Sequence, residues 1–220
     1  MPAAYVFDAY GTLFDVHSAV RRHVEVIGRE RGGRLSELWR QKQLEYSWIR
    51  ALSGRYRNFE AITADALDFA MASVAPDCAA LKPALMEAYH RLEAYPEVPA
   101  VLRSLKARGA RTSILSNGTP AMLGAAIEAA GIASLIDVTL SVDSVPTYKT
   151  DPRVYQLAVD ALAVGAKEIS FQSSNRWDIA GAVAFGLRSV WINRAGNPDD
   201  YPDLAPSAVI RSLAELPDLA

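Results

Sequence analysis

The most constraining feature of the sequence is an uncharged apolar run that ends at a single carboxylate. Residues 3–7 read Ala-Ala-Tyr-Val-Phe, Asp8 follows, and Gly11 comes three residues later. Such a run is typical of a strand that is buried on both faces of a parallel sheet. A glycine then allows the chain to turn sharply. The pattern predicts a carboxylate at the C-terminal edge of a sheet, where open α/β folds bind ligands. On this stretch alone, an aspartate that caps a turn explains it equally well.

The composition narrows the class of protein. With 50% hydrophobic and 22% charged residues, the 220-residue chain is ordinary for a soluble globular protein. Its net charge of -2 argues against a nucleic-acid partner, because no basic excess is present to displace phosphate counterions. We see no secretory signal and no apolar stretch of about 20 residues, so no membrane partner is expected. The single cysteine, Cys78, excludes an internal disulfide. We therefore expect a cytoplasmic protein.

Residues 16–95 carry almost no strand-like alternation and are rich in Arg, Glu, Ala and Leu. We expect four successive helices here, with the first ended by the pair Gly32-Gly33, over residues 16–31, 36–52, 59–74 and 77–93. Four helices with short joints indicate a helical insertion rather than part of a sheet.

From Pro96 onward, predicted helices and strands alternate. The expected helices cover 98–108, 121–130, 152–163 and 178–185, and the expected strands cover 111–115, 138–141, 168–171 and 188–192. A possible last short helix covers 207–216. This order predicts an α/β fold with a doubly wound parallel sheet. The core would combine residues 1–15 and 96–220, and residues 16–95 would form a separate helical domain.

Polar residues cluster just after the predicted strands, so they should meet at one edge of the sheet. The clusters are Asp8; Ser116-Asn117; Lys149; and the run with Ser173, Ser174, Asn175 and Asp178. In this order they resemble the four signatures of the haloacid dehalogenase-like hydrolases. The resemblance covers the whole chain, including the position of the helical insertion. It implies a Rossmann-like core with an inserted helical cap domain.

Two positions depart from most members of that superfamily, which are magnesium-dependent phosphohydrolases. Their second aspartate, two residues after the nucleophile, is replaced by Tyr10, whose phenol has an ordinary pKa of ~10. Their magnesium-binding aspartate, four residues before Asp178, is replaced by Ser174. A neutral serine would hold Mg²⁺ only weakly. Both departures argue against phosphoryl transfer, and we expect no metal and no cofactor.

The segments 8–15, 39–48 and 173–178 closely resemble the (S)-2-haloacid dehalogenase branch. The resemblance implies that Asp8 attacks C2 of a short (S)-2-haloacid, releases halide with inversion, and forms an ester. Water would then hydrolyse the ester and give an (R)-2-hydroxyacid. A homodimer through the cap helices is also implied. Two alternatives remain: a magnesium-dependent phosphatase with altered motifs, and a catalytically silent acid-binding relative.

The resemblance also assigns roles to single residues. Lys149 would keep Asp8 ionised, and Asp178 would orient or deprotonate the hydrolytic water. Arg40 would take the leaving halide with its fork of donors. The remaining expected catalytic residues support or polarise Asp8 or bond within the site: Thr12, Tyr155, Ser173 and Asn175, the last of which could also cap a helix.

Substrate contacts are expected from two groups of residues. The substrate carboxylate would bind the side chain of Ser116 and backbone N–H groups near Ala9 and Tyr10. Asn117 would support Asp8 or the ligand. An apolar wall would comprise Tyr10, Leu44, Phe59 and Trp177, although ordinary core packing is a serious rival for the last two. Arg176 stands where we expect a small residue, and the sequence offers no explanation for it.

Overall fold

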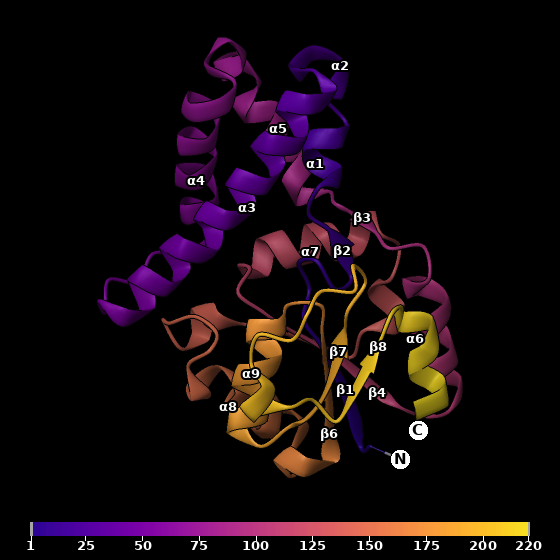
Figure 1. The fold of residues 1–220 in the computed structure, drawn as a ribbon. Helices are drawn as coiled ribbons and strands as arrows, with labels where there is room; N and C mark the ends of the chain where they lie inside the picture. Colours follow the sequence, from indigo (N-terminus) through magenta and orange to yellow (C-terminus); the bar gives the residue numbers. More distant parts are fainter. Residues whose placement is uncertain (1, 220) are drawn as a thin grey trace.

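The computed structural model describes residues 2–219 and is built around one six-stranded parallel sheet (Figure 1). Its strand order is β5-β4-β1-β6-β7-β8, and every neighbouring pair is parallel. The strands are β1 (Ala4–Phe7), β4 (Arg111–Ser116), β5 (Val138–Ser141), β6 (Ile169–Ser173), β7 (Arg188–Ile192) and β8 (Ala208–Ile210). The predicted doubly wound α/β core is therefore confirmed.

The first strand holds the central position that its composition predicts. All four residues of β1 are buried, and the strand lies between β4 and β6. A strand with covered faces needs apolar side chains on both, which explains why the run lacks charge. The backbone N–H of Asp8 donates to the Gln172 carbonyl at 2.9 Å and continues the ladder by one residue. The carboxyl ends of β1, β4 and β6 therefore meet at one edge.

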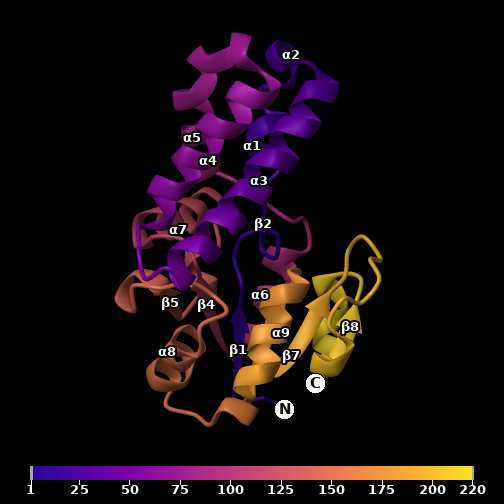
Figure 2. The same cartoon turned by 60° about the vertical axis from the view of Figure 1, so that its left-hand side comes forward.

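Helices cover both faces of the sheet. Helices α8 (Pro152–Leu162) and α9 (Arg176–Phe185) pack together on one face (Figure 2). The other face is covered by α6 (Val98–Ala107), α7 (Pro120–Ala129) and the 3₁₀ segment η6 (Leu213–Leu219). Shorter 3₁₀ segments are η2 (Ala133–Leu135), η3 (Val142–Ser144), η4 (Ala166–Glu168) and η5 (Pro202–Leu204). Within residues 2–219, no helix is both long and apolar enough to cross a membrane.

A helical cap, inserted after β1, stands over the carboxyl edge of the sheet (Figure 1). It consists of α1 (Ser18–Arg21), α2 (Val24–Ile27), α3 (Arg29–Leu52), α4 (Phe59–Val74), η1 (Pro76–Leu81) and α5 (Lys82–His90). Helices α3 and α4 pack closely, and Trp39 Nε1 donates to the Thr63 carbonyl at 2.8 Å. Two short antiparallel strands, β2 (Phe14–Asp15) and β3 (Glu93–Ala94), lie at the ends of the insertion. The proposed domain limits of 16 and 95 fall beside them.

The predicted helix break at Gly32-Gly33 is wrong, because both glycines lie inside α3. Gly32 is buried against Val20 and Val24, and this packing overrides the cost of about 1 kcal/mol of glycine in a helix. The chain turns instead at Gly28, whose φ of 90° suits a residue without a side chain. The helix predicted over 16–31 accordingly becomes α1, α2 and the start of α3. The helix predicted over 77–93 is divided between η1 and α5.

The last short helix, predicted over 207–216, is also wrong. Ala208–Ile210 form β8, which pairs with β7, and the Ser207 N–H donates to the Ser189 carbonyl at 2.8 Å. The β-branched residues Val209 and Ile210 favour a strand where a sheet edge can receive one. The 3₁₀ segment η6 follows only at Leu213.

Candidate active site

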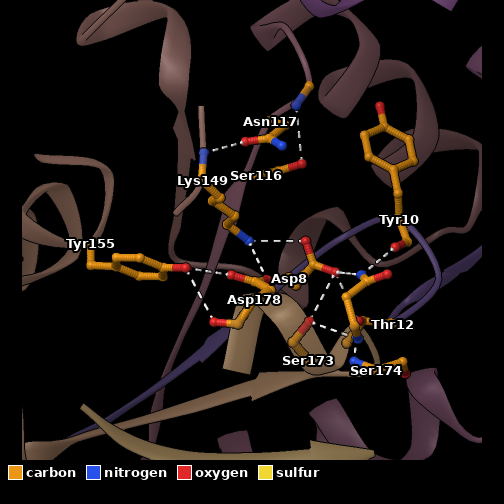
Figure 3. Close-up of polar contacts among 12 residues, drawn as sticks. Asp8, Tyr10, Thr12, Ser116, Asn117, Lys149, Tyr155, Ser173, Ser174 and Asp178 are labelled. Atoms are coloured by element: carbon orange, nitrogen blue, oxygen red, sulfur yellow. Dashed lines mark hydrogen bonds and ion pairs between the residues drawn. The ribbon is translucent and has the colours of Figure 1, made fainter. Parts of the chain in front are cut away.

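The Asp8 carboxylate lies at the centre of the polar cluster that follows the strands (Figure 3). It is 5% exposed. Its Oδ1 accepts a hydrogen bond from Lys149 Nζ at 3.0 Å. Its Oδ2 accepts from Thr12 Oγ1 at 2.9 Å and from Asn175 Nδ2 at 2.8 Å, with Ser173 Oγ at 3.4 Å. The structure therefore brings four of the predicted catalytic residues to one carboxylate.

The Lys149 ammonium joins two carboxylates. Its Nζ, on a side chain that is 1% exposed, also donates to Asp178 Oδ2 at 2.8 Å. Burial lowers the pKa of Lys149, but the charges of Asp178 and Asp8 outweigh burial, so the pKa is raised and the ammonium stays charged. A charged lysine between two buried carboxylates counteracts their mutual repulsion.

Asp178 is fully buried in the first turn of α9. Burial raises its pKa to about 6, with the Lys149 charge acting in the opposite direction. Tyr155 Oη donates to Asp178 Oδ1 at 2.8 Å (Figure 3). Because this pKa is close to 7, the carboxylate of Asp178 can both accept and release a proton near neutral pH.

Side chains of the same loops fix the backbone around these groups. Thr12 Oγ1 accepts from the Ser174 N–H at 2.8 Å, so that one hydroxyl joins the first and last loops. Asn117 Oδ1 accepts from the Lys149 N–H at 3.1 Å, and Asn117 thus contacts the lysine backbone rather than Asp8. Ser116 Oγ accepts from the Gly118 N–H at 3.1 Å. Its own hydroxyl proton can still be donated.

Backbone donors lie beside the carboxylate as well. Within residues 2–219, the N–H groups of Ala9 and Tyr10 make no hydrogen bond to the protein, whereas those of Asp8 and Gly11 both do. Consecutive free N–H groups in a turn form a binding place for an anion. Together with Ser116, they can bind the carboxylate of a small acid.

Aromatic rings form the cap-facing wall of the site. The ring of Tyr10 stacks on Phe59 at 5.6 Å and on Tyr89 at 5.5 Å between centroids. Burial raises the pKa of Tyr10 well above 10, so the phenol remains neutral. Its hydroxyl oxygen is buried and lacks a hydrogen-bond partner within residues 2–219. Tyr89 is not among the residues predicted for the site, because a buried aromatic residue on a cap helix has the same sequence pattern as an ordinary core residue.

Helix α3 brings Arg40 from the cap to the loops that carry Tyr10 and Asn175. One guanidinium nitrogen, Nη2, donates to Asn175 Oδ1 at 3.2 Å and approaches the Tyr10 carbonyl at 3.4 Å. Arg40 is half-buried, and so is Leu44, one helical turn later. The residue predicted to receive the halide thus lies beside a residue that holds Asp8.

A cleft of about 640 Å³ opens beside Lys149. Trp177 lines it and packs edge-on against Trp48 of the cap, with 5.7 Å between ring centroids. Trp177 therefore belongs to this cleft and not to the stack of Tyr10 and Phe59. Asp8 does not line the cleft, and Lys149 is the member of the polar cluster that does.

The donor set does not suit the Mg²⁺ of phosphate-transferring relatives. Within residues 2–219, no group of three or more His, Cys, Asp or Glu side chains could hold a metal ion. Lys149 Nζ occupies the hydrogen-bonding positions between Asp8 Oδ1 and Asp178 Oδ2. At the position of the magnesium-binding aspartate, four residues before Asp178, this chain has the neutral hydroxyl of Ser174. Mg²⁺ prefers anionic oxygens as ligands.

Comparison with known proteins identifies the family. The sequence model of the haloacid dehalogenase-like hydrolases matches residues 2–186. (S)-2-haloacid dehalogenase 1 of Pseudomonas sp. (strain CBS-3) is 49% identical over 217 residues, which are 98% of this chain and 95% of the relative. A crystal structure of a dehalogenase has a TM-score of 0.97 at 46% identity and covers 100% of this chain and 97% of its own.

A further solved structure is the L-2-haloacid dehalogenase from Xanthobacter autotrophicus with chloropropionic acid covalently bound. It has a TM-score of 0.88 at 35% identity and covers 100% of this chain and 98% of its own. The fold and the strand-end cluster agree with these matches. The chain belongs to the haloacid dehalogenase-like hydrolase family, in the branch of the (S)-2-haloacid dehalogenases.

Proposed function

We propose that the protein hydrolyses the carbon–halogen bond of short (S)-2-haloacids and yields (R)-2-hydroxyacids and halide. The observation that carries this proposal is the unequal environment of the two Asp8 oxygens. Oδ2 has three donors within 3.4 Å, whereas Oδ1 has only Lys149 Nζ among residues 2–219. A carboxylate held in this way can attack with one oxygen while the other is kept in place by its donors. The names of the relatives support the same chemistry.

In the first step, Asp8 Oδ1 attacks C2 on the side opposite the halogen. The new O–C bond forms as the carbon–halogen bond breaks, and the halide leaves with the bonding electrons. Carbon is inverted, and an ester joins Asp8 to the substrate. A halide needs no proton to leave, so the neutral Tyr10 at the position of the phosphatase acid is no obstacle. Arg40 offers its guanidinium to the departing anion.

In the second step, Asp178 takes a proton from water, and the hydroxide attacks Cγ of Asp8. Negative charge then develops on Oδ2, and Thr12, Ser173 and Asn175 act as an oxyanion hole for it. Collapse breaks the Cγ–Oδ1 bond, and the hydroxyacid departs with Oδ1 and the proton from Asp178. The new carboxyl group of Asp8 then ionises.

The substrate carboxylate would bind the Ser116 hydroxyl and the N–H groups of Ala9 and Tyr10. The rings of Tyr10 and Phe59 would exclude water from C2 during the first step, with Leu44 completing the wall. Exclusion of water protects the ester and strengthens every charge interaction in the site.

We also propose that the protein is a homodimer formed through the cap, and that it is cytoplasmic. Exposed apolar side chains on the cap support the dimer: Val26, Ile49, Leu52 and Phe69. The lone Cys78 is buried and forms no disulfide, in keeping with a reducing compartment. Light scattering after size-exclusion chromatography should give the mass of two chains, and the mass of one chain would contradict the dimer.

A halide-release panel tests the function. Purified protein is incubated with (S)- and (R)-2-chloropropionate, with and without EDTA, and chloride and lactate are measured by ion chromatography and chiral separation. We expect chloride and (R)-lactate in equal amounts from the (S)-acid alone, at the same rate with the chelator. Loss of activity with EDTA, together with Mg²⁺-dependent phosphate release from phosphate esters, would favour the phosphatase. Binding without halide release, measured by calorimetry, would favour a silent relative.

A further inference from the structure

Arg176 lies between Asn175 and Asp178 in sequence, yet its side chain bonds to residues 199–204 and not to Asp8. It is 6% exposed. Its Nε donates to Asp199 Oδ1 at 2.7 Å, and its Nη2 donates to the Leu204 carbonyl at 3.0 Å and to the Tyr201 carbonyl. A buried arginine with three acceptors on one segment is a specific contact rather than a solvated surface charge.

These bonds join the first turn of α9 to residues 199–204, a segment whose only regular structure is η5. Asp199 Oδ1 also accepts from the Tyr201 N–H at 2.9 Å, so one carboxylate binds both the arginine and its own segment. The guanidinium lies over the rings of Tyr201 and Trp191, at 5.4 Å and 5.7 Å from their centroids. Arg176 thus contacts the segment by charge, by hydrogen bonds and by ring stacking.

The segment forms part of the cleft beside Lys149. Tyr201 and Leu204 line that cleft together with the cap residues Trp48 and Leu52. Much of the remaining wall is apolar, including Ala180 and Ala184 on α9. The carboxylates of Asp8 and Asp178 have their own donors, and none of those donors is Arg176. Loss of the arginine should therefore move the cleft wall and leave the reacting groups in place.

We propose that Arg176 is a positioning residue that holds residues 199–204 in place as the outer wall of the cleft, and so sets which C2 substituents the enzyme accepts. The inference rests on the proposed dehalogenase function. A 2-haloacid with C2 at Asp8 would extend its alkyl chain past Lys149 into the apolar cleft. A longer chain then gains contacts with Tyr201 and Leu204, whereas a methyl group does not reach them. The fork of arginine donors matches three acceptors on the segment, a geometry that a lysine cannot reproduce.

Steady-state halide release on two substrates with the same halogen tests the proposal. For Arg176→Ala we expect KM for (S)-2-bromohexanoate to rise about tenfold, as for lost contacts in an apolar pocket. KM for (S)-2-bromopropionate and kcat for both acids should stay unchanged. Arg176→Lys should restore part of the selectivity, and Asp199→Asn should lose part of it. A purely structural role would lower activity on both acids equally and would overturn the proposal.

Arg31→Ala is the matched control. Arg31 also donates to an aspartate, Asp77, and to a backbone carbonyl, that of Ile27, but on the cap surface. It should leave the ratio of kcat/KM for the two acids unchanged. A shift of that ratio equal to that of Arg176→Ala would show a general effect of arginine loss and would contradict the proposal.

Hydrogen–deuterium exchange tests the contact of Arg176 with residues 199–204 independently of catalytic activity. In Arg176→Ala, amides of residues 199–204 should exchange faster than in the wild type, while those of β6 and the second half of α9 should not. Unchanged exchange in 199–204 would overturn the positioning role even if KM rises. If the wild-type protein releases no halide from any 2-haloacid, the proposed function and the selectivity role fail together. In that case, hydrogen–deuterium exchange alone shows whether Arg176 holds residues 199–204 in place.

Discussion

The core side and the cap side of the site are built differently. On the core side, Asp8 accepts hydrogen bonds of 3.0 Å or less from Lys149, Thr12 and Asn175, all on strand-end loops of one sheet. On the cap side, Arg40 is half-buried and makes two longer contacts, at 3.2 Å and 3.4 Å. The aromatic residue Phe59 stacks on Tyr10. In the proposed mechanism, the core would therefore fix the geometry of bond making, and the cap would contact the substrate.

This division has a physical basis. Displacement at carbon requires the attacking oxygen within a few tenths of an ångström of its line of approach, and stiff strand ends with mutual hydrogen bonds provide that. Binding of an alkyl chain and a halide allows larger displacements, because dispersion contacts and hydrogen bonds from a guanidinium group can form over a range of positions. Core-side variants that remove a direct partner of Asp8 should therefore slow the chemical step most, and variants on the cap side should mainly weaken binding.

The largest effect should come from the core-side variant Lys149→Met. It removes the cation that faces Asp8 and Asp178, leaving two buried carboxylates without a countercharge. We expect kcat to fall about 10³-fold, comparable to loss of a key electrostatic group in other enzymes. The melting temperature should also fall, since uncompensated buried charge is destabilising.

Lys106→Met is the control for that experiment, because Lys106 pairs with Asp137 near the surface, away from the site. It should leave kcat unchanged. If Lys149→Met kept most of the wild-type kcat while folding normally, the core side would not control the chemistry in the way described.

A smaller effect is expected on the cap side from Arg40→Lys. A lysine keeps the charge but loses the planar fork that contacts Asn175 and the Tyr10 carbonyl. We expect kcat/KM to fall about 10- to 100-fold, the range for charged hydrogen bonds. Steady-state halide release measures it, and Arg34→Lys, at an exposed position of the same helix, should show no change. A loss as large as that of Lys149→Met would erase the contrast between the two sides.

The smallest effect at neutral pH is expected from Tyr155→Phe. Because the pKa of Asp178 is about 6, and Asp178 must be ionised to take a proton from water, ester hydrolysis should slow below about pH 6. The Tyr155 hydroxyl donates to this carboxylate and favours its ionised form, so its loss should raise the pKa of Asp178. The acid limb of the kcat profile should move to higher pH.

Tyr46→Phe on the cap helix α3 is the control for the pH profile, and its acid limb should coincide with that of the wild type. If the limb of Tyr155→Phe stayed in place or moved to lower pH, Asp178 would not be the group whose ionisation limits ester hydrolysis.

The core side of the site could be predicted from the sequence, because residue type and position relative to the strands indicate its chemistry. Asp8 directly follows the apolar run of β1, Asp178 lies in the first turn of the helix after β6, and Lys149 lies in the loop that follows β5. Parallel strands bring such loops together at one edge of the sheet. The structure joins these three residues through one ammonium group.

The parts that could not be predicted depend on contacts between distant segments. Gly32 fits within a helix because it packs on Val20 and Val24, which no local pattern reveals. Residues 208–210 form a strand because β7 offers a free edge. Arg176, without explanation in the sequence, bonds to residues 23 to 28 positions later. Local propensity cannot anticipate such tertiary partners.

The most direct test of the central claim is a single turnover in water enriched in oxygen-18, with enzyme in excess over (S)-2-chloropropionate. If Asp8 forms the ester and water attacks Cγ, the label enters the Asp8 carboxylate, and the lactate carries an unlabelled hydroxyl oxygen from Asp8. Mass spectrometry measures the oxygen-18 content of the lactate and of the peptide that contains Asp8. Label in the lactate hydroxyl and none in Asp8 would mean that water attacks C2 directly, which contradicts a nucleophilic Asp8.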